Sequence, residues 1–425
     1  MVDHIRLFET ASAFTEAYAN DYVEPWVSYV LETSGVAFNK SVPQHDYSMD
    51  YLTFEILSGG DIGWRYYVEK YGEGTVPDCA KTIEYRVNNG QWNEITSTEE
   101  GVFFAVETGD IVEFRGDNKA YGADDGVSYF FINSFDYEGN LTTAVFNVYG
   151  NIMSLVNSTD FTGVTTLVSA YTFDTIFSHC TGLTSAENLI LPATTLTDFC
   201  YEYMFEGCES LTTVPSILPA TTVADYSYAG LFYNCTSLVT VPSDYLPASI
   251  VGERSYNAMF MGCTSLTTAP ELPATTLGSS CYEYMFSDCT SLTTAPELPA
   301  TALAEQCYCD MFYNCSSLTM APELPATTLA VGCYYRMFGD CTSLTTAPEL
   351  PAATLTINCY WEMFKNCTNL NQIKCLATDI SASQCTDSWV YNVASSGTFV
   401  KNPNMSSWTT GNDGIPSNWT VQDAS

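Results

Sequence analysis

Positively charged side chains are scarce in this sequence. It has only 13 Lys and Arg residues against 49 Asp and Glu residues, and its formal net charge is −36 at pH 7. Nucleic-acid binding depends on cationic contacts to phosphate groups, so this balance excludes a nucleic-acid partner. It also disfavours binding to anionic membrane surfaces, and acidity of this size mainly keeps a protein soluble.

Long apolar runs are missing as well. The most apolar stretches are short and interrupted by Thr, Pro or charged residues, so we expect no membrane insertion. The amino terminus, MVDHIRLFETASAF, has early acidic residues and no basic segment ahead of an apolar core, which is not the pattern of a signal peptide. We therefore do not expect Sec-dependent export, although the chain could leave a cell within a particle assembled there.

Histidine is nearly absent. His4, His45 and His179 stand in no metal-ligand pattern, and His179 is expected at an exposed turn. Cys281 and Cys289 lie eight positions apart, which is not the C-x-x-C spacing of a zinc site. Nothing places a histidine beside an acid and a nucleophile. The sequence therefore predicts no catalytic residues, no metal and no cofactor, and the protein is not expected to be an enzyme.

What the sequence contains instead is an internal repeat. The segment CYEYMFSDCTSLTTAPELPATALAEQ, residues 281–306, recurs nearly unchanged at 307–332 and 333–358, and in a shorter copy from residue 359. A cysteine shortly after the Phe marks each unit, with steps of 26 to 28 residues, at Cys180, Cys208, Cys235, Cys263, Cys289, Cys315, Cys341 and Cys367. Repetition at this period predicts a solenoid of about eight coils over residues 166–375.

Each coil is predicted to contain two short extended segments. LTTAP, with Leu292 pointing inward, and ELPATAL, with Leu303 pointing inward, should pair only with the same segments of neighbouring coils. Phe286 and its equivalents should stack at the coil spacing, within the range of favourable aromatic pairs. A slip of one residue would expose every column at once, so the register is strongly specified.

The segment CYEYMFSDC has helical spacing at Cys281, Met285 and Cys289, and is expected to form two turns of helix. Asp288 and its equivalents precede the second cysteine, where Asn or Asp can adopt a left-handed conformation. The seventeen cysteines repeat in phase, and parallel columns do not favour disulfide geometry, so we predict buried free thiols. An in-phase glutamate column is interpreted as a solvated edge, with a weak divalent-cation ladder as the alternative, at Glu271, Glu297, Glu323 and Glu349.

Three further regions flank the repeat. Residues 1–45 carry a short amphipathic pattern followed by a proline and several aromatic residues, and would need a partner surface. Residues 46–165 contain short alternating runs typical of a small β-sandwich, with Asn89-Gly90 indicating a hairpin. Residues 376–425 leave the period and gather three tryptophans, so they are expected to cap the open end of the solenoid.

The repeat resembles the BspA-like class of leucine-rich repeats. The 26-residue period and the in-phase Phe and Cys carry this resemblance over residues 170–375, whereas the proline-rich APELPATTL variant departs from the commoner form of the family. The family occurs in surface proteins of gut and oral bacteria, in some protists and in phages. The resemblance thus implies a surface protein, mostly β with short helical turns.

Residues 4–40 resemble the amino-terminal segment of virion proteins of crAss-like phages, above all at EPWVSY and VAFNK. In that context the segment implies a particle-attachment element ahead of variable outer domains. The residues that would carry attachment to capsid or tail proteins are Pro25, Trp26, Val27 and Tyr29.

Positions that vary from one repeat to the next are better binding candidates than the fixed Phe, Cys and Leu positions. Tyr313, Tyr335 and Trp361 would form exposed aromatics on one flank, suited to stacking on sugars or on a partner protein. The alternative is that tyrosines in this region merely shield the turn of the next coil.

The sequence therefore predicts a non-enzymatic phage virion protein, a head or tail fibre on the virion surface. Its solenoid would adhere to a host-surface protein or glycan, and we expect a homo-oligomer, with a trimer favoured by analogy. The alternative is a BspA-like adhesin on a bacterial cell surface.

Overall fold

A computed structural model describes residues 45–425 apart from 69–78, 124–126, 133–142 and 407. Two short 3-10 helices, η1 (Tyr47–Met49) and η2 (Ile152–Leu155), are the only helices in these described ranges. None of the helices in this part of the chain is long and apolar enough to span a membrane. The fold is mostly β with turns, as the sequence predicted.

The chain divides into two compact units, Met1–Tyr47 and Ser48–Ser425. The amphipathic segment expected in the first unit lies outside the described residues, and so do the candidate attachment residues Pro25, Trp26, Val27 and Tyr29. The description below concerns the second unit.

Two sheets form a sandwich at the start of this unit. The first has the order β10-β9-β1-β6-β3-β4 and the second the order β5-β2-β8-β7. Their strands are β1 (Leu52–Ser58), β2 (Gly60–Val68), β3 (Thr82–Val87), β4 (Asn93–Thr96), β5 (Val102–Val106), β6 (Ile111–Arg115), β7 (Gly122–Ala123), β8 (Val127–Ile132), β9 (Val145–Asn151) and β10 (Leu183–Ile190). Phe54 and Phe114 on one sheet contact Phe131 on the other, at ring-centroid distances of 5.0 and 4.8 Å. The sandwich core is therefore aromatic.

Two details of the sandwich differ from the sequence prediction. Strand β2, with the sequence GDIGWRYYV, is not one of the alternating runs that predicted strands, because two glycines interrupt it; its charged Arg65 is buried in the structure. The β3–β4 hairpin turns one residue earlier than predicted: Asn88 and Asn89 have φ angles of 51° and 57°, and Gly90 N–H donates to Val87 O at 2.9 Å. Both asparagines accept the left-handed conformation that such a turn requires.

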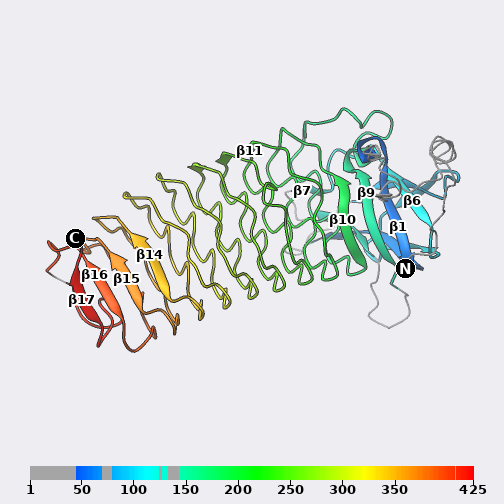
Figure 1. The fold of residues 1–425 in the computed structure, drawn as a ribbon. Helices are drawn as coiled ribbons and strands as arrows, with labels where there is room; N and C mark the ends of the chain where they lie inside the picture. The colour runs from blue at the N-terminus through cyan, green and yellow to red at the C-terminus, as the bar shows by residue number, and fades with distance from the viewer. Residues whose placement is uncertain (1–44, 69–78, 124–126, 133–142, 407) are drawn as a thin grey trace, which may run out of the picture. The chain divides into compact units, whose positions relative to one another are not determined.

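The sandwich and the solenoid share one sheet. Strand β9 pairs antiparallel with β1 and parallel with β10, which belongs to the first coil. Figure 1 shows these strands side by side where the array of coils begins. The first coil therefore continues the sandwich sheet, and its edge is not exposed.

The coils pair only with their neighbours, as predicted. Short parallel strands form on one side at β11 (Thr222–Val223), β12 (Ile250–Val251) and β13 (Thr276–Leu277). On another side single parallel bridges join Thr268 to Thr294 and Thr294 to Met320. Leu292 is fully buried and Leu303 packs against the core, which confirms their inward direction.

The segment 281–289 forms consecutive tight turns in place of the predicted helix. Ser280, Tyr284 and Asp288 have φ angles of 52°, 58° and 60°. The left-handed conformation predicted for Asp288 is confirmed, and the same conformation recurs every four residues along the turn. These turns are drawn as the winding loops of Figure 1.

Backbone N–H groups in this segment alternate between two acceptors. Met285 N–H donates within the coil to Tyr282 O at 3.2 Å, whereas Phe286 N–H donates to Met311 O in the next coil at 2.9 Å. The helix prediction is wrong because an α-helix keeps its N–H groups within one segment. Here half of them join one coil to the next.

Two aromatic columns fill the coils. The predicted Phe column is confirmed, with centroid distances of 5.3–5.8 Å between successive rings of Phe177, Phe205, Phe232, Phe260, Phe286, Phe312, Phe338 and Phe364. A second column was not predicted and spaces its buried rings at 5.5–6.2 Å, through Phe173, Tyr201, Tyr228, Tyr256, Tyr282, Tyr308, Tyr334 and Tyr360.

Residues 376–425 cover the last of these coils. A parallel sheet runs through β14 (Thr346–Leu350), β15 (Gln372–Cys375), β16 (Thr398–Lys401) and β17 (Thr420–Asp423). The buried Trp389 contacts Tyr360 and Phe364 at centroid distances of 6.2 and 6.3 Å, so one side chain closes both aromatic columns. Trp408 then stacks on Trp389 at 5.6 Å.

Candidate functional site

The outer surface of the turn segments carries side chains that differ from coil to coil. We call it the turn face, and it is formed by the outward-facing side chains of residues 199–207, 226–234, 254–262, 280–288, 306–314, 332–340 and 358–366. Each segment has left-handed residues at its first, fifth and ninth positions. The fifth position is occupied in turn by Tyr203, Gly230, Ala258, Tyr284, Asp310, Arg336 and Glu362.

The three predicted binding residues gather around Arg336. The rings of Tyr335 and Trp361 are in contact, with centroids 5.3 Å apart. The guanidinium carbon of Arg336 lies 4.6 Å from the ring centroid of Tyr313 and 5.8 Å from that of Tyr335. All three aromatic side chains are half-buried, less exposed than the sequence suggested. We call these four residues the aromatic–arginine cluster.

A buried carboxylate holds Arg336 in place. The Nε–H of Arg336 donates to Asp310 Oδ1, and the side chain of Asp310 has no exposed surface, whereas that of Arg336 is 30% exposed. Burial raises the pKa of Asp310, while the hydrogen bond and charge of Arg336 oppose that rise. The thiol of Cys309 also donates to Asp310 Oδ2 at 3.2 Å. Asp310 thus holds the guanidinium of Arg336 from the buried side, and the rest of the Arg336 side chain is partly exposed to solvent.

Amide groups separate the carboxylates at the ninth position of the turn face. Asn314 Nδ2 donates to Asp288 Oδ1 at 2.8 Å, and Asn366 Nδ2 donates to Asp340 Oδ1 at 2.9 Å. Because Asp and Asn alternate, no two of these four residues place like charges in adjacent coils.

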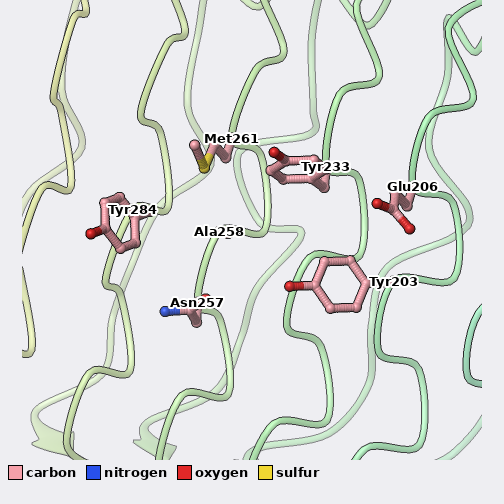
Figure 2. A pocket seen from close by; sticks show the side chains of 7 residues that line it. All are labelled: Tyr203, Glu206, Tyr233, Asn257, Ala258, Met261 and Tyr284. Carbon is pink, nitrogen blue, oxygen red and sulfur yellow. The ribbon is translucent and has the colours of Figure 1, made fainter. Parts of the chain in front are cut away.

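A shallow cavity of about 350 Å³ lies on the turn face several coils before the cluster. Its lining residues are Tyr203, Glu206, Tyr233, Asn257, Ala258, Met261 and Tyr284. Figure 2 shows Ala258 between Tyr233 and Tyr284, with the Tyr203 hydroxyl directed toward Asn257. The rings of Tyr203 and Tyr233 meet edge to face at a centroid distance of 6.2 Å. We call this the tyrosine cavity, and the sequence did not predict it.

The tyrosine cavity lies in a negative electrostatic environment. Burial, together with the charges of Glu202 and Glu206, raises the pKa of Tyr203 to about 12. Burial likewise raises the pKa of Tyr284 to about 12, with a contribution from Asp310. None of the described residues that line the cavity is a Lys, Arg or His. Its chemistry combines aromatic faces with carboxylate charge.

The remaining sequence candidates are surface features. Glu271, Glu297, Glu323 and Glu349 are exposed, and Glu349 pairs with Lys374 of the following coil at 2.7 Å. His179 is exposed at a turn, as predicted. Within the described ranges, no three His, Cys, Asp or Glu side chains come together as a metal-binding group.

Comparison with known proteins identifies the repeat. The family model described as BspA type leucine rich repeat region matches in six copies, over residues 132–319 and 281–390, which together make up more than half of the chain. The chain belongs to this family. No curated protein and no solved structure matches it.

Membership of this family suggests a broad role for the chain. Leucine-rich-repeat solenoids are typically non-catalytic, and a BspA-type solenoid suggests a surface-adhesion or protein-binding role. The turn face, with its half-buried aromatics and its cavity, is the candidate surface for such a role.

Proposed function

We propose that this protein is a non-enzymatic adhesion protein that binds a host-surface protein or glycan through its turn face. The observation that carries the proposal is that the repeated residues of each coil are buried, whereas the residues that vary lie on the turn face. Phe312, Tyr308 and Cys315 repeat in every late coil and are buried between coils, whereas Tyr313 and Arg336 stand at positions that change. The residues that vary from coil to coil, such as Tyr313 and Arg336, are therefore the ones available to bind a partner.

The aromatic–arginine cluster supplies the binding chemistry. Tyr335, Trp361 and Tyr313 offer partly exposed ring faces, which stack on sugars or on apolar groups of a partner. Arg336 is held by Asp310, so the cluster is pre-organised and loses little side-chain freedom on binding.

We also propose that the protein is carried on a phage virion as a head or tail fibre. The support is the resemblance of residues 4–40, with Pro25, Trp26, Val27 and Tyr29 as the attachment residues. Symmetric sets of fibres, with a trimer favoured, would let individually weak contacts add up to useful avidity. The alternative, an adhesin on a bacterial cell surface, uses the same turn face and differs only in what carries it.

Adhesion is tested with the full chain on a glycan array and on a panel of gut-bacterial cells. Replacing Tyr313, Tyr335 and Trp361 together by Ala should lower binding about tenfold or more. Tyr67→Ala, at an exposed tyrosine of β2, is the matched control and should bind as the native protein does. Equal binding by the triple variant would refute the turn face as the adhesive surface.

The virion proposal has a separate test. Mass spectrometry of purified phage particles should detect the chain, and deletion of residues 1–45 should prevent its incorporation. A chain that is found on bacterial cells and never in particles would establish the alternative. Normal incorporation of the truncated chain would remove the attachment role of Trp26 and its neighbours.

A further inference from the structure

The repeat allows the tyrosine cavity to be compared with the aromatic–arginine cluster, position by position. Tyr233 and Tyr313 occupy the same place in their coils, three residues after the fifth position of the turn. The fifth position of the following coil is Ala258 in the first case and Arg336 in the second, with φ angles of 52° and 48°. The tyrosine cavity therefore lies where the structure elsewhere places an arginine side chain.

That place is occupied by a guanidinium group in the cluster. The guanidinium carbon of Arg336 lies 4.6 Å from the ring centroid of Tyr313, within the range of a cation–π contact. At the earlier coil Ala258 is too short to reach the ring of Tyr233, and the space is the cavity that Figure 2 shows beside Ala258.

The walls of the cavity are aromatic on several sides. A Cβ atom at Gly230 would come within 2.2 Å of the ring of Tyr203, so only glycine at position 230 leaves room for that ring. Gly230 also has a φ angle of 60°, which glycine adopts without strain. Tyr203, Tyr233 and Tyr284 thus surround a position that is suited to a flat cation.

The tyrosine cavity also has a carboxylate, although it is not at the position of Asp310. In the cluster the carboxylate partner of the guanidinium is Asp310, at the position that Gly230 occupies in the earlier coil. The cavity has its own carboxylate at Glu206, whose Oε2 accepts a hydrogen bond from Ser178 at 3.2 Å. The acidic cavity repels anionic ligands, and the chain as a whole carries a formal charge of −36.

We propose that the tyrosine cavity binds the guanidinium group of an arginine side chain presented by a partner protein. The arginine would lie against Tyr233 as Arg336 lies against Tyr313, and would pair with Glu206. A guanidinium is favoured over an ammonium group because it is planar and stacks on aromatic faces. This inference rests on the proposed adhesive role of the turn face, and it names the partner chemistry for one part of that face.

The first test measures binding of N-acetyl-argininamide to the full chain by calorimetry and by tyrosine shifts in NMR. The native protein should bind one molecule, and Ala258→Arg should abolish the binding because its own side chain fills the cavity. Tyr233→Leu and Glu206→Gln should each weaken it about tenfold. Tyr67→Ala, at an exposed tyrosine of β2 outside the turn face, is the matched control and should bind as the native protein does.

The second test builds the site anew. The triple variant Ser287→Glu, Asp310→Gly, Arg336→Ala copies Glu206, Gly230 and Ala258 into the later coils, and should raise the stoichiometry from one to two. Circular dichroism and the thermal midpoint establish that each variant is folded.

Three results would overturn the inference: no binding to the native protein, unchanged binding to Ala258→Arg, or N-acetyl-lysinamide binding as tightly as the arginine probe. Failure of the probe, combined with loss of adhesion in the triple aromatic variant, would reject the arginine site and leave the adhesive function standing. Adhesion that survives in the triple variant would instead reject the aromatic–arginine cluster, whatever the probe does.

Discussion

The thiol of Cys315 donates a hydrogen bond to the carbonyl oxygen of Phe286 in the preceding coil, with an Sγ–O distance of 3.1 Å. The same bond, at 3.0–3.2 Å, is made in the other coils by Cys208, Cys235, Cys263, Cys289, Cys341 and Cys367. Cysteine suits this column because it is small, apolar and still a weak donor. The column is therefore a hydrogen-bonded ladder of thiols.

The thiols should be chemically inert in the folded protein. Sixteen of the seventeen are free and buried within the described ranges, and Cys79 is half-buried. Burial raises the pKa of Cys263 and of Cys359 to about 12, so the reactive thiolate is rare at neutral pH. Titration with a thiol reagent should detect at most Cys79 in the native state and all seventeen cysteines in denaturant. Several fast-reacting thiols in the native protein would contradict the ladder.

Trp389 should be the most sensitive residue at the carboxyl end of the solenoid. Its removal uncovers Tyr360 and Phe364 together, so Trp389→Ala should lower the free energy of unfolding of this end by about 3–5 kcal/mol. Hydrogen exchange should accelerate across residues 359–392. Trp361→Ala, at a half-buried tryptophan, is the control and should cost about 1 kcal/mol or less. Equal exchange rates in the two variants would show that Trp389 does not close the columns.

The hydroxyl of Tyr201 should be dispensable although its ring is not. This buried oxygen has no hydrogen-bond partner among the described residues, and the ring stacks between Phe173 and Tyr228. Tyr201→Phe should leave stability unchanged or raise it by about 1 kcal/mol. Tyr121 provides the contrast, because its hydroxyl donates to Leu155 O at 2.6 Å. Tyr121→Phe should therefore lower the thermal midpoint, and the opposite order of the two variants would refute this account.

Arg336 should stabilise the fold mainly by neutralising Asp310. Arg336→Ala leaves a buried carboxylate without its cation and should cost about 3 kcal/mol at neutral pH. Adding Asp310→Asn should recover most of that loss in denaturant unfolding. Arg254→Ala is the control, because Arg254 is 42% exposed and lies 3.8 Å from Glu283, and it should cost less than about 1 kcal/mol. A double variant no more stable than Arg336→Ala would disprove the pairing.

Stability should rise when the protein is acidified. Burial raises the pKa of Glu202 from 4.5 to about 7, and burial raises that of Asp174 well above its usual value. The folded state therefore holds these protons more tightly than the unfolded state does, and stability is lost as the pH rises from about 4.5 to 7. Glu202→Gln should remove about 2 kcal/mol or less of this pH-dependent change in the free energy of unfolding, so the thermal midpoint should vary less with pH. Glu209→Gln, at an exposed glutamate, should leave the dependence unchanged.

The solenoid could be predicted from the sequence because identical letters at a fixed period must occupy identical environments. Phe286, Cys289 and Leu292 recur every 26 residues, and only stacked coils give each copy the same neighbours. The stacking distance of the phenylalanines and the burial of the cysteines follow from that arrangement alone.

The turns could not be predicted in the same way. Cys281, Met285 and Cys289 have helical spacing, but a period of four is also the period of the left-handed residues in the observed turns. Tyr308 repeats as regularly as Phe312, yet a tyrosine suits either the core or a surface, and only the packing of adjacent coils places it in a column. The spacing of residues within one coil does not indicate which backbone N–H groups donate to the next coil.

The sequence by itself determined the repeat, its register and the buried columns of Phe, Cys and Leu, because each depends on spacing along the chain. The tertiary structure decided the proposed binding surface, because its aromatic–arginine cluster and its cavity join residues from different coils. Arg336 reaches the ring of Tyr313 from the following coil, and Ala258 leaves the equivalent space above Tyr233 open. Arg336 and Tyr313, like Ala258 and Tyr233, lie more than twenty positions apart in the chain, and only the stacking of the coils brings the two residues of each pair together.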